Sequence, residues 1–394
     1  MFTPDPQKIL IVDDSMSNIM MLKESLSDFN CIAATSGNQA LLLAKQDKKP
    51  DLILLDIVMK GMDGYEVCME LKKDPLTLDI PVIFLSSQDD ADSLVKGFNV
   101  GAVDFIGKPF HEDELTVRVN NQLKFKKSLD NNALYLKSIE DIYDTITDSM
   151  YYAQKIQQAT LPHKDYMDRV LDEYFVFYKP RDIVSGDFYL VHEIDNKVLL
   201  VAADCTGHGV PGALMSMMSM ALINEMINIE NKYTPNEILN QLRYIIIDTF
   251  NAEGKDEITD GLDASIIVID KAQNEAVFSG ANSPLYLVRD GELIEYKGDR
   301  MPVGIYPTQT PFTKHKIELK ENDCIYLSSD GYADQFGGES NRKMMLKPFK
   351  EVLASGSYLH MKEQEERINK HFSDWKGYNE QVDDVLVMGY RYKG

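Results

Sequence analysis

The chain has 394 residues, more than one hydrophobic core usually supports, so we expect two domains and a connector. Apolar residues make up 44% and charged residues 26%, a balance typical of soluble globular proteins and not of disordered or membrane chains. Because 63 acidic side chains outnumber 41 basic ones, the net charge of −22 argues against binding to nucleic acid or to an anionic membrane surface.

The sequence predicts a cytoplasmic protein. The first eight residues contain two prolines and lack a cationic stretch followed by an apolar one, so we expect no secretory signal. The apolar run at residues 213–223 is too short to cross a bilayer and predicts a buried helix. The cysteines are far apart and lack the spacing of zinc ligands, which favours a reducing compartment; they are Cys31, Cys68, Cys205 and Cys324.

Residues 1–122 are predicted to form an α/β domain with a doubly wound parallel sheet. Continuous apolar runs of strand length occur at 9–12, 52–55 and 82–85, and segments 18–29 and 37–45 between them have helical periodicity. Such alternation predicts a parallel sheet covered on both faces, with its functional site at the carboxyl ends of the strands.

Five polar residues fall at these strand ends. Asp13 and Asp14 follow the first strand, Asp56 ends the third, Ser86 ends the fourth, and Lys108 follows a strand-like run at 103–106. The carboxylates can hold Mg²⁺, and the metal together with Lys108 can neutralise an incoming phosphoryl group. Asp56 can then act as the nucleophilic acceptor, while Ser86 can donate a hydrogen bond to a phosphoryl oxygen.

This segment resembles the response-regulator receiver family through Val12-Asp13-Asp14, Met62-Asp63-Gly64 after Asp56, and Lys108-Pro109-Phe110. The resemblance implies that a cognate histidine kinase phosphorylates Asp56, that Asp13, Asp14 and Asp56 bind Mg²⁺, and that Ser86, Phe105 and Lys108 form the switch. Lys60 stands where the family often has proline. A receiver fold that binds no phosphate is the alternative, but every chemical position is filled.

Residues 123–162 are predicted to form a helical linker with a coiled-coil seam. The segment has no strand signal, and one set of residues recurs at alternating intervals of three and four: Leu129, Asn132, Leu136, Ile139, Tyr143, Ile146, Met150 and Ala153. This heptad pattern predicts a homodimer through the linker, with polar Asn132 fixing the register. The alternative is a single helix that packs its apolar stripe on the following domain of its own chain.

Residues 163–394 are predicted to form a mixed domain of strands and helices. Strand-like segments occur at 174–178, 198–203, 264–269, 324–327 and 385–389, and helical ones at 213–229 and 235–250. Four acids lie beside predicted strand ends: Asp187, Asp204, Asp330 and Asp383. Carboxylates gathered in this way can hold two divalent ions about 4 Å apart, which activate a water molecule for attack on a phosphoester.

These motifs resemble the PPM metal-dependent phosphatases of the stage II sporulation protein E type across residues 153–391. The resemblance is carried by Val184-Ser185-Gly186-Asp187-Phe188, Ala203-Asp204 with Gly207-His208-Gly209, Ser328-Ser329-Asp330-Gly331, and Gln381-Val382-Asp383-Asp384. It implies a β-sandwich flanked by helices, two Mn²⁺ or Mg²⁺ ions, and phosphoserine or phosphothreonine proteins as substrates.

The same resemblance assigns roles to single acids. Asp204 would bridge both metals, Asp330 and Asp383 would complete one metal site, and Asp187 would serve the other directly or through water. Asp384 adjoins Asp383 and is an alternative ligand.

Three further positions bear on substrate contacts. Asn282 stands where many relatives have histidine and is a candidate contact to substrate, and Leu386 stands where threonine is common. His208 is a candidate proton donor to the leaving serine oxygen, although a histidine between glycines is as often a structural turn residue.

We therefore expect a two-component response regulator whose output is metal-dependent dephosphorylation of phosphoserine or phosphothreonine on a protein, controlled by phosphorylation of Asp56. Family resemblance favours an anti-sigma-factor antagonist as substrate. The alternative is a non-catalytic adaptor that binds a phosphoprotein and is gated by the receiver. A transcriptional regulator is disfavoured, because the output region has no basic stripe or compact helix-turn-helix segment.

Overall fold

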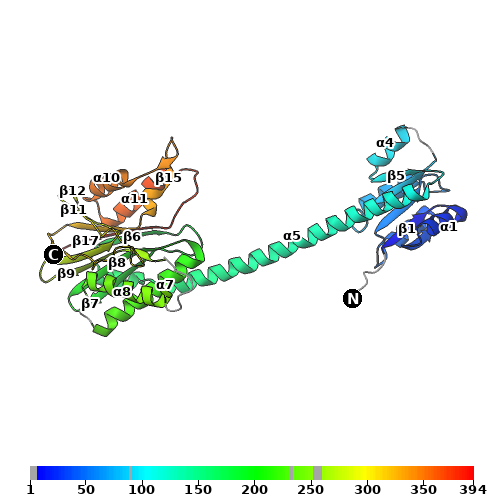
Figure 1. Ribbon diagram of the computed structural model, residues 1–394. Helices are drawn as coiled ribbons and strands as arrows, with labels where there is room; N and C mark the ends of the chain where they lie inside the picture. Colours follow the sequence, from blue (N-terminus) through cyan, green and yellow to red (C-terminus); the bar gives the residue numbers. More distant parts are fainter. Residues whose placement is uncertain (1–6, 88–90, 231–233, 252–259) are drawn as a thin grey trace. The chain divides into compact units, whose positions relative to one another are not determined.

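The computed structural model describes residues 7–87, 91–230, 234–251 and 260–394. The chain divides into two compact units, one up to Tyr143 and the other from Asp144. One helix, α5 (Glu112–Thr160), runs from the first unit into the second (Figure 1). The first six residues, on which the expected absence of a secretory signal mostly depends, lie outside the described part of the chain.

The N-terminal unit contains a five-stranded parallel sheet in the order β2-β1-β3-β4-β5. Every residue of β1, β3 and β4 is buried, which explains why these strands appear in the sequence as unbroken apolar runs. The predicted doubly wound receiver fold is thus confirmed. Its elements are β1 (Lys8–Val12), α1 (Met16–Ser25), β2 (Asn30–Ala34), α2 (Gly37–Ala44), β3 (Leu52–Asp56), α3 (Gly64–Lys73), β4 (Val82–Ser86), α4 (Ala91–Asn99) and β5 (Asp104–Gly107).

Helix α5 combines the last helix of the receiver with the predicted linker. It is 49 residues long and begins at Glu112, eleven positions before the predicted linker starts (123 − 112 = 11). It ends two residues before Pro162, whose ring disfavours a helical conformation at the preceding residue. The domain boundaries at 122 and 162 remain predictions, because residue 122 lies inside the helix and the helix ends at Thr160, two residues before 162.

The C-terminal unit is a β-sandwich between two layers of helices (Figure 1), as the sequence predicted. Its first sheet has the order β13-β10-β9-β8-β7 and its second β12-β11-β14-β17-β6, with antiparallel pairing throughout. The strands are β6 (Tyr174–Lys179), β7 (Phe188–Ile194), β8 (Lys197–Cys205), β9 (Leu262–Asp270), β10 (Glu275–Ala281), β11 (Leu285–Arg289), β12 (Glu292–Tyr296), β13 (His315–Glu318), β14 (Cys324–Ser328) and β17 (Val385–Arg391), with a small hairpin β15 (Phe336–Gly337) and β16 (Arg342–Lys343).

Helices cover the outer faces of both sheets. On the first sheet lie α7 (Gly209–Glu230) and α8 (Pro235–Asn251), and on the second lie α10 (Leu346–Gly356) and α11 (Met361–Lys376); short helices are α6 (Lys164–Val170) and α9 (Gly331–Asp334). The core between the sheets is apolar and includes Leu200, Ile267, Leu327 and Met388. Burial of this kind contributes about 25 cal/mol per Å² of apolar surface and fixes the strand ends that carry the acids.

Helix α7 is longer than the predicted segment at 213–229. By length and composition alone its Gly209–Asn228 stretch could cross a membrane, but half of the most apolar window is buried inside the unit. Ile223, Met226 and Ile227 belong to the core against the first sheet. This packing favours the core helix that the sequence predicted.

Candidate functional site

The receiver residues gather at the carboxyl end of the parallel sheet, as their positions after β1, β3 and β5 require. Ligand oxygens of Asp13, Asp14 and Asp56 all lie within 4.8 Å of one another. Lys108 Nζ lies 3.0 Å from Asp13 Oδ2 and 2.9 Å from Asp56 Oδ1. Burial raises the pKa of Asp56, and the hydrogen bond from Lys108 opposes that rise. The group has the oxygen donors that Mg²⁺ prefers, next to a fixed cation for a phosphoryl group.

The two other predicted switch residues lie on neighbouring strands. Ser86 ends β4 and is buried, and its carbonyl accepts the backbone N–H of Lys108 at 2.7 Å. The Phe105 ring packs 5.5 Å from Phe84 and 5.0 Å from Phe98, measured between ring centroids. Gly97 on α4 makes room for it, because a Cβ there would lie only 2.2 Å from the ring.

In the C-terminal unit, three of the four predicted acids share one cleft. This cleft has a volume of roughly 200 Å³ and is lined by Asp204, Asp330 and Asp383 together with Asp263 and His208. Among the described residues of this unit, no three carboxylates bring ligand oxygens within 4.8 Å of one another, so these acids are more widely spaced than those of the receiver.

Strand pairing explains why residues so distant in sequence meet. Asp204 at the end of β8 stands directly opposite Asp263 at the start of β9. In the second sheet β14 and β17 are antiparallel, so Asp330 just after β14 meets Asp383 just before β17. The two sheets pack face to face, which brings these two strand-end pairs into the same cleft.

Asp187 is not among the cleft-lining residues and lies in the interior. It precedes β7 and is only 1% exposed. Its Oδ2 accepts a hydrogen bond from Ser329 Oγ at 2.6 Å, whereas its Oδ1 is buried with no hydrogen-bond partner. A buried carboxylate oxygen without a partner is costly, and a cation would satisfy it.

Asp384 is held by backbone groups instead of facing the cleft. It is 3% exposed, and its two oxygens accept the N–H of Arg181 at 2.7 Å and the N–H of Gly186 at 2.7 Å. Burial raises its pKa, and these two hydrogen bonds oppose that rise. Through these hydrogen bonds Asp384 holds the 180–187 loop between β6 and β7 in place, whereas its neighbour Asp383 lines the cleft.

The acids of the site disfavour one another's ionised forms. Burial raises the pKa of Asp187 and that of Asp204 well above the usual carboxyl range, and repulsion from the surrounding aspartates adds to both. Burial also raises the pKa of Asp330, and repulsion from Asp334 and Asp383 acts in the same direction. A cluster of this kind is stabilised by divalent cations, because their charge offsets the repulsion between carboxylates.

Sequence reasoning missed Asp263. Burial raises its pKa to about 6, and its Oδ1 accepts a hydrogen bond from Asn282 Nδ2 at 2.8 Å. Asn282, the candidate substrate contact, therefore has its amide turned towards a cleft carboxylate. The available signal was the Asp260-Gly261-Leu262-Asp263 segment where a strand begins, which has the same pattern of an acid at a strand end as the other motifs.

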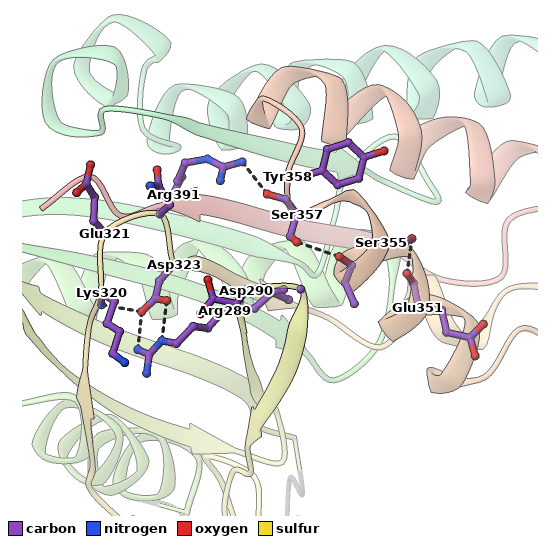
Figure 2. A pocket seen from close by; sticks show the side chains of 14 residues that line it. Arg289, Asp290, Lys320, Glu321, Asp323, Glu351, Ser355, Ser357, Tyr358 and Arg391 are labelled. Carbon is purple, nitrogen blue, oxygen red and sulfur yellow. Dashed lines mark hydrogen bonds and ion pairs between the residues drawn. The ribbon is translucent and has the colours of Figure 1, made fainter.

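A larger cavity, about 890 Å³, lies away from the acids (Figure 2). It is at the opposite ends of β14 and β17, lined by residues that precede β14, such as Asp323, and by Arg391 at the end of β17. Figure 2 shows Arg289 turned onto Asp323, with Nε–Oδ1 and Nη2–Oδ2 distances of 2.9 and 2.6 Å. Arg391 is held by Glu173 and by backbone carbonyls. Both guanidinium groups therefore stabilise the fold through these contacts, and neither is directed at a ligand in the cavity.

Comparisons with known proteins agree with both parts of this description. A model of the response regulator receiver domain matches residues 9–120, and a model of stage II sporulation protein E matches residues 194–393. Among solved structures, the SiaA-PP2C domain of Pseudomonas aeruginosa is similar with a TM-score of 0.59 and 30% sequence identity. The match covers 64% of this chain and 99% of that one.

Curated relatives match through the receiver part. The response regulator PleD of Caulobacter vibrioides is 39% identical over 125 residues, which cover 31% of this chain and 27% of PleD. A probable cyclic di-GMP phosphodiesterase of Vibrio cholerae is 45% identical over 123 residues, covering 31% of this chain and 28% of that protein. The chain thus spans little more than a quarter of these relatives. Since the sporulation-protein model covers just over half of the 394 residues, the chain belongs to the stage II sporulation protein E (SpoIIE) family, here with a receiver domain in front of the family domain.

Proposed function

We propose that the chain is a response regulator whose output is a metal-dependent phosphatase acting on phosphoserine or phosphothreonine in a protein. The observation that carries the proposal is the acid-lined cleft behind which Asp187 lies buried with an unpartnered oxygen. Such a donor set consists only of carboxylates and suits hard divalent ions such as Mn²⁺ or Mg²⁺. When bound, these ions would supply an activated water molecule and neutralise phosphate charge.

Each acid then has a distinct task. Asp204, Asp330 and Asp383 line the cleft and would ligate the ions, with Asp204 shared between them. Asp187 would reach an ion directly or through water from its buried position. We add Asp263 as a further acid facing the same ions, held in place by Asn282. Asp384 would act indirectly, by holding the loop that carries Asp187.

Control by the receiver would pass along α5. Near its end, Gln157 is 3% exposed and binds the 180–187 loop, which carries Asp187. Its Nε2 donates to the Ser185 carbonyl at 2.6 Å and to Ser216 Oγ at 2.9 Å, and its Oε1 accepts the Ser185 N–H at 3.1 Å. Ser185 is two residues from Asp187, so a displacement of the helix end would shift a site acid.

A homodimer through α5 fits the exposure of its seam. Leu136, Ile139, Tyr143 and Ile146 are each more than half exposed in the single chain. Two seams facing each other would remove this apolar surface from water, which is the usual reason for a two-stranded coiled coil.

A cognate histidine kinase would phosphorylate Asp56 with Mg²⁺ bound at the receiver, and an anti-sigma-factor antagonist is the proposed substrate. The deciding experiment measures inorganic phosphate released from a panel of phosphoserine and phosphothreonine proteins, with Mn²⁺, with Mg²⁺ or with chelator. Parallel samples carry the receiver with and without phosphate on Asp56. Binding of a phosphoprotein without turnover under every condition would establish the adaptor instead.

A further inference from the structure

His208 is held at the rim of the cleft by a carboxylate from another loop. It lies between Gly207 and Gly209, whose φ values of 87° and 65° suit glycine, and it lines the cleft with the acids. Its Nδ1 is 3.0 Å from Oδ2 of Asp182. No hydrogen bond to its Nε2 is found in the described part of the chain, so that nitrogen is available to a molecule in the cleft.

Asp182 can hold His208 in place because the adjacent residue, Arg181, is itself held by two hydrogen bonds. The Arg181 N–H donates to Asp384 at 2.7 Å, and Arg181 Nη1 donates to the Val382 carbonyl at 3.0 Å. Asp182 and His208 have side chains 38% and 51% exposed, and exposed pairs of this kind contribute little to stability. Substitution of Asp182 is therefore expected to leave the fold intact.

We propose that Asp182 is a positioning residue, which orients the His208 ring so that Nε2–H can protonate the leaving group. The inference rests on the proposed phosphatase function. As the oxygen of water bonds to phosphorus, the bond from phosphorus to the seryl or threonyl oxygen breaks, and its electron pair takes the Nε2 proton. The products are a free hydroxyl, inorganic phosphate and a neutral ring whose Nδ1–H stays on Asp182.

The test compares two leaving groups. A phosphoserine peptide expels an alkoxide that needs a proton, whereas p-nitrophenyl phosphate expels a stable phenolate that does not. In the full chain loaded with Mn²⁺, Asp182→Ala should lower kcat on the peptide roughly 10- to 100-fold, which is less than the roughly 100- to 10,000-fold that a general acid usually contributes, because the His208 ring is still present. Turnover of p-nitrophenyl phosphate should be nearly unchanged.

Two further variants sharpen the comparison. His208→Gln should show the same split between substrates, and the double variant should be no worse than His208→Gln alone, since the two residues act as one unit. Asp248→Ala removes an exposed acid on α8, away from the cleft, and should leave both activities unaltered. An equal loss on both substrates in Asp182→Ala would overturn the proposal.

A measurement without metal or turnover completes the test. Nitrogen NMR of the His208 ring in metal-free protein reports which nitrogen carries the proton of the neutral form. The proton should be on Nδ1 in the parent and should move to Nε2 in Asp182→Ala. An unchanged tautomer would also overturn the proposal. A parent protein that turns over neither substrate would instead refute the phosphatase function itself.

Discussion

Gln157 offers the sharpest test of how α5 supports the catalytic cleft. Gln157→Leu keeps the size of the side chain but removes the amide that contacts Ser185 and Ser216. The buried Ser185 N–H then loses its acceptor, at a cost of about 1–3 kcal/mol. Loss of the two donated bonds adds about 1 kcal/mol, because Ser185 O can still accept from Ser216 Oγ at 3.3 Å. We expect a total loss of about 2–4 kcal/mol in the free energy of unfolding of the C-terminal unit.

The assay is urea unfolding followed by fluorescence. Trp375 is the chain's one tryptophan and lies on α11, so its emission reports on the C-terminal unit. Phosphate release should fall at least about tenfold, since misplacing a catalytic group by about 1 Å can cost a hundredfold. Gln158→Leu is the matched control, because Gln158 is the exposed neighbour on the same helix. If the two variants were equally stable and equally active, the proposed link from α5 to the site loop would be refuted.

Four other outcomes follow from the same structure. Asp204→Asn should abolish metal-dependent phosphate release while circular dichroism and the Trp375 emission stay as in the parent, and unchanged turnover by such a folded variant would contradict the two-metal assignment. Asp263→Asn should weaken Mn²⁺ activation, seen as a higher metal concentration for half-maximal activity; an unaltered metal dependence would remove Asp263 from the site. Asp56→Asn should no longer take up phosphate from a small phosphodonor in the presence of Mg²⁺, as judged by intact-mass spectrometry, and labelling equal to the parent would mean that another residue is the acceptor. Ile139→Lys combined with Ile146→Lys should convert a dimer to a monomer in light scattering and uncouple activity from Asp56 phosphorylation, whereas a parent that is already monomeric would eliminate the dimeric relay.

The receiver fold could be predicted in detail because its signals are local. Buried parallel strands such as Leu52–Asp56 are apolar up to the functional residue, and each functional residue lies at the end of a strand or just after it. The predicted contacts among Asp13, Asp56 and Lys108 followed once the strands were assigned to one sheet.

The phosphatase cleft was only partly predictable. The four acids stood out through the glycines and strands beside them, but the sequence favoured Asp383 over Asp384 as a ligand only through family resemblance and left Asp384 as an alternative. Their difference depends on the loop that approaches from residues 180–187, a contact nearly 200 positions away along the chain. Asp263 was missed because its role depends on the register of β8 against β9, which no local pattern encodes.

The Asp182–His208 and Gln157–Ser185 contacts were also not predictable. Both join loops or helix ends whose approach is set by the packing of the sandwich. The helix ends at Thr160, near the expected end of the linker at residue 162, but no local pattern indicated that a buried glutamine there would bind the 180–187 loop.

The pairing of β6 with β17 has a consequence for synthesis of the protein. β6 opens the sandwich and β17 is its last strand, and they lie side by side with Val385 opposite Lys179. Asp384, which directly precedes β17, also holds the loop that carries Asp187 through two hydrogen bonds. A chain still emerging from the ribosome holds Asp187 and Asp204 long before Asp383 and Asp384 are made. During translation, therefore, the receiver can fold first, while the cleft stays incomplete until the final strand is released and inserted. We therefore expect the receiver of the nascent chain to be able to take up phosphate before the cleft can bind metal ions.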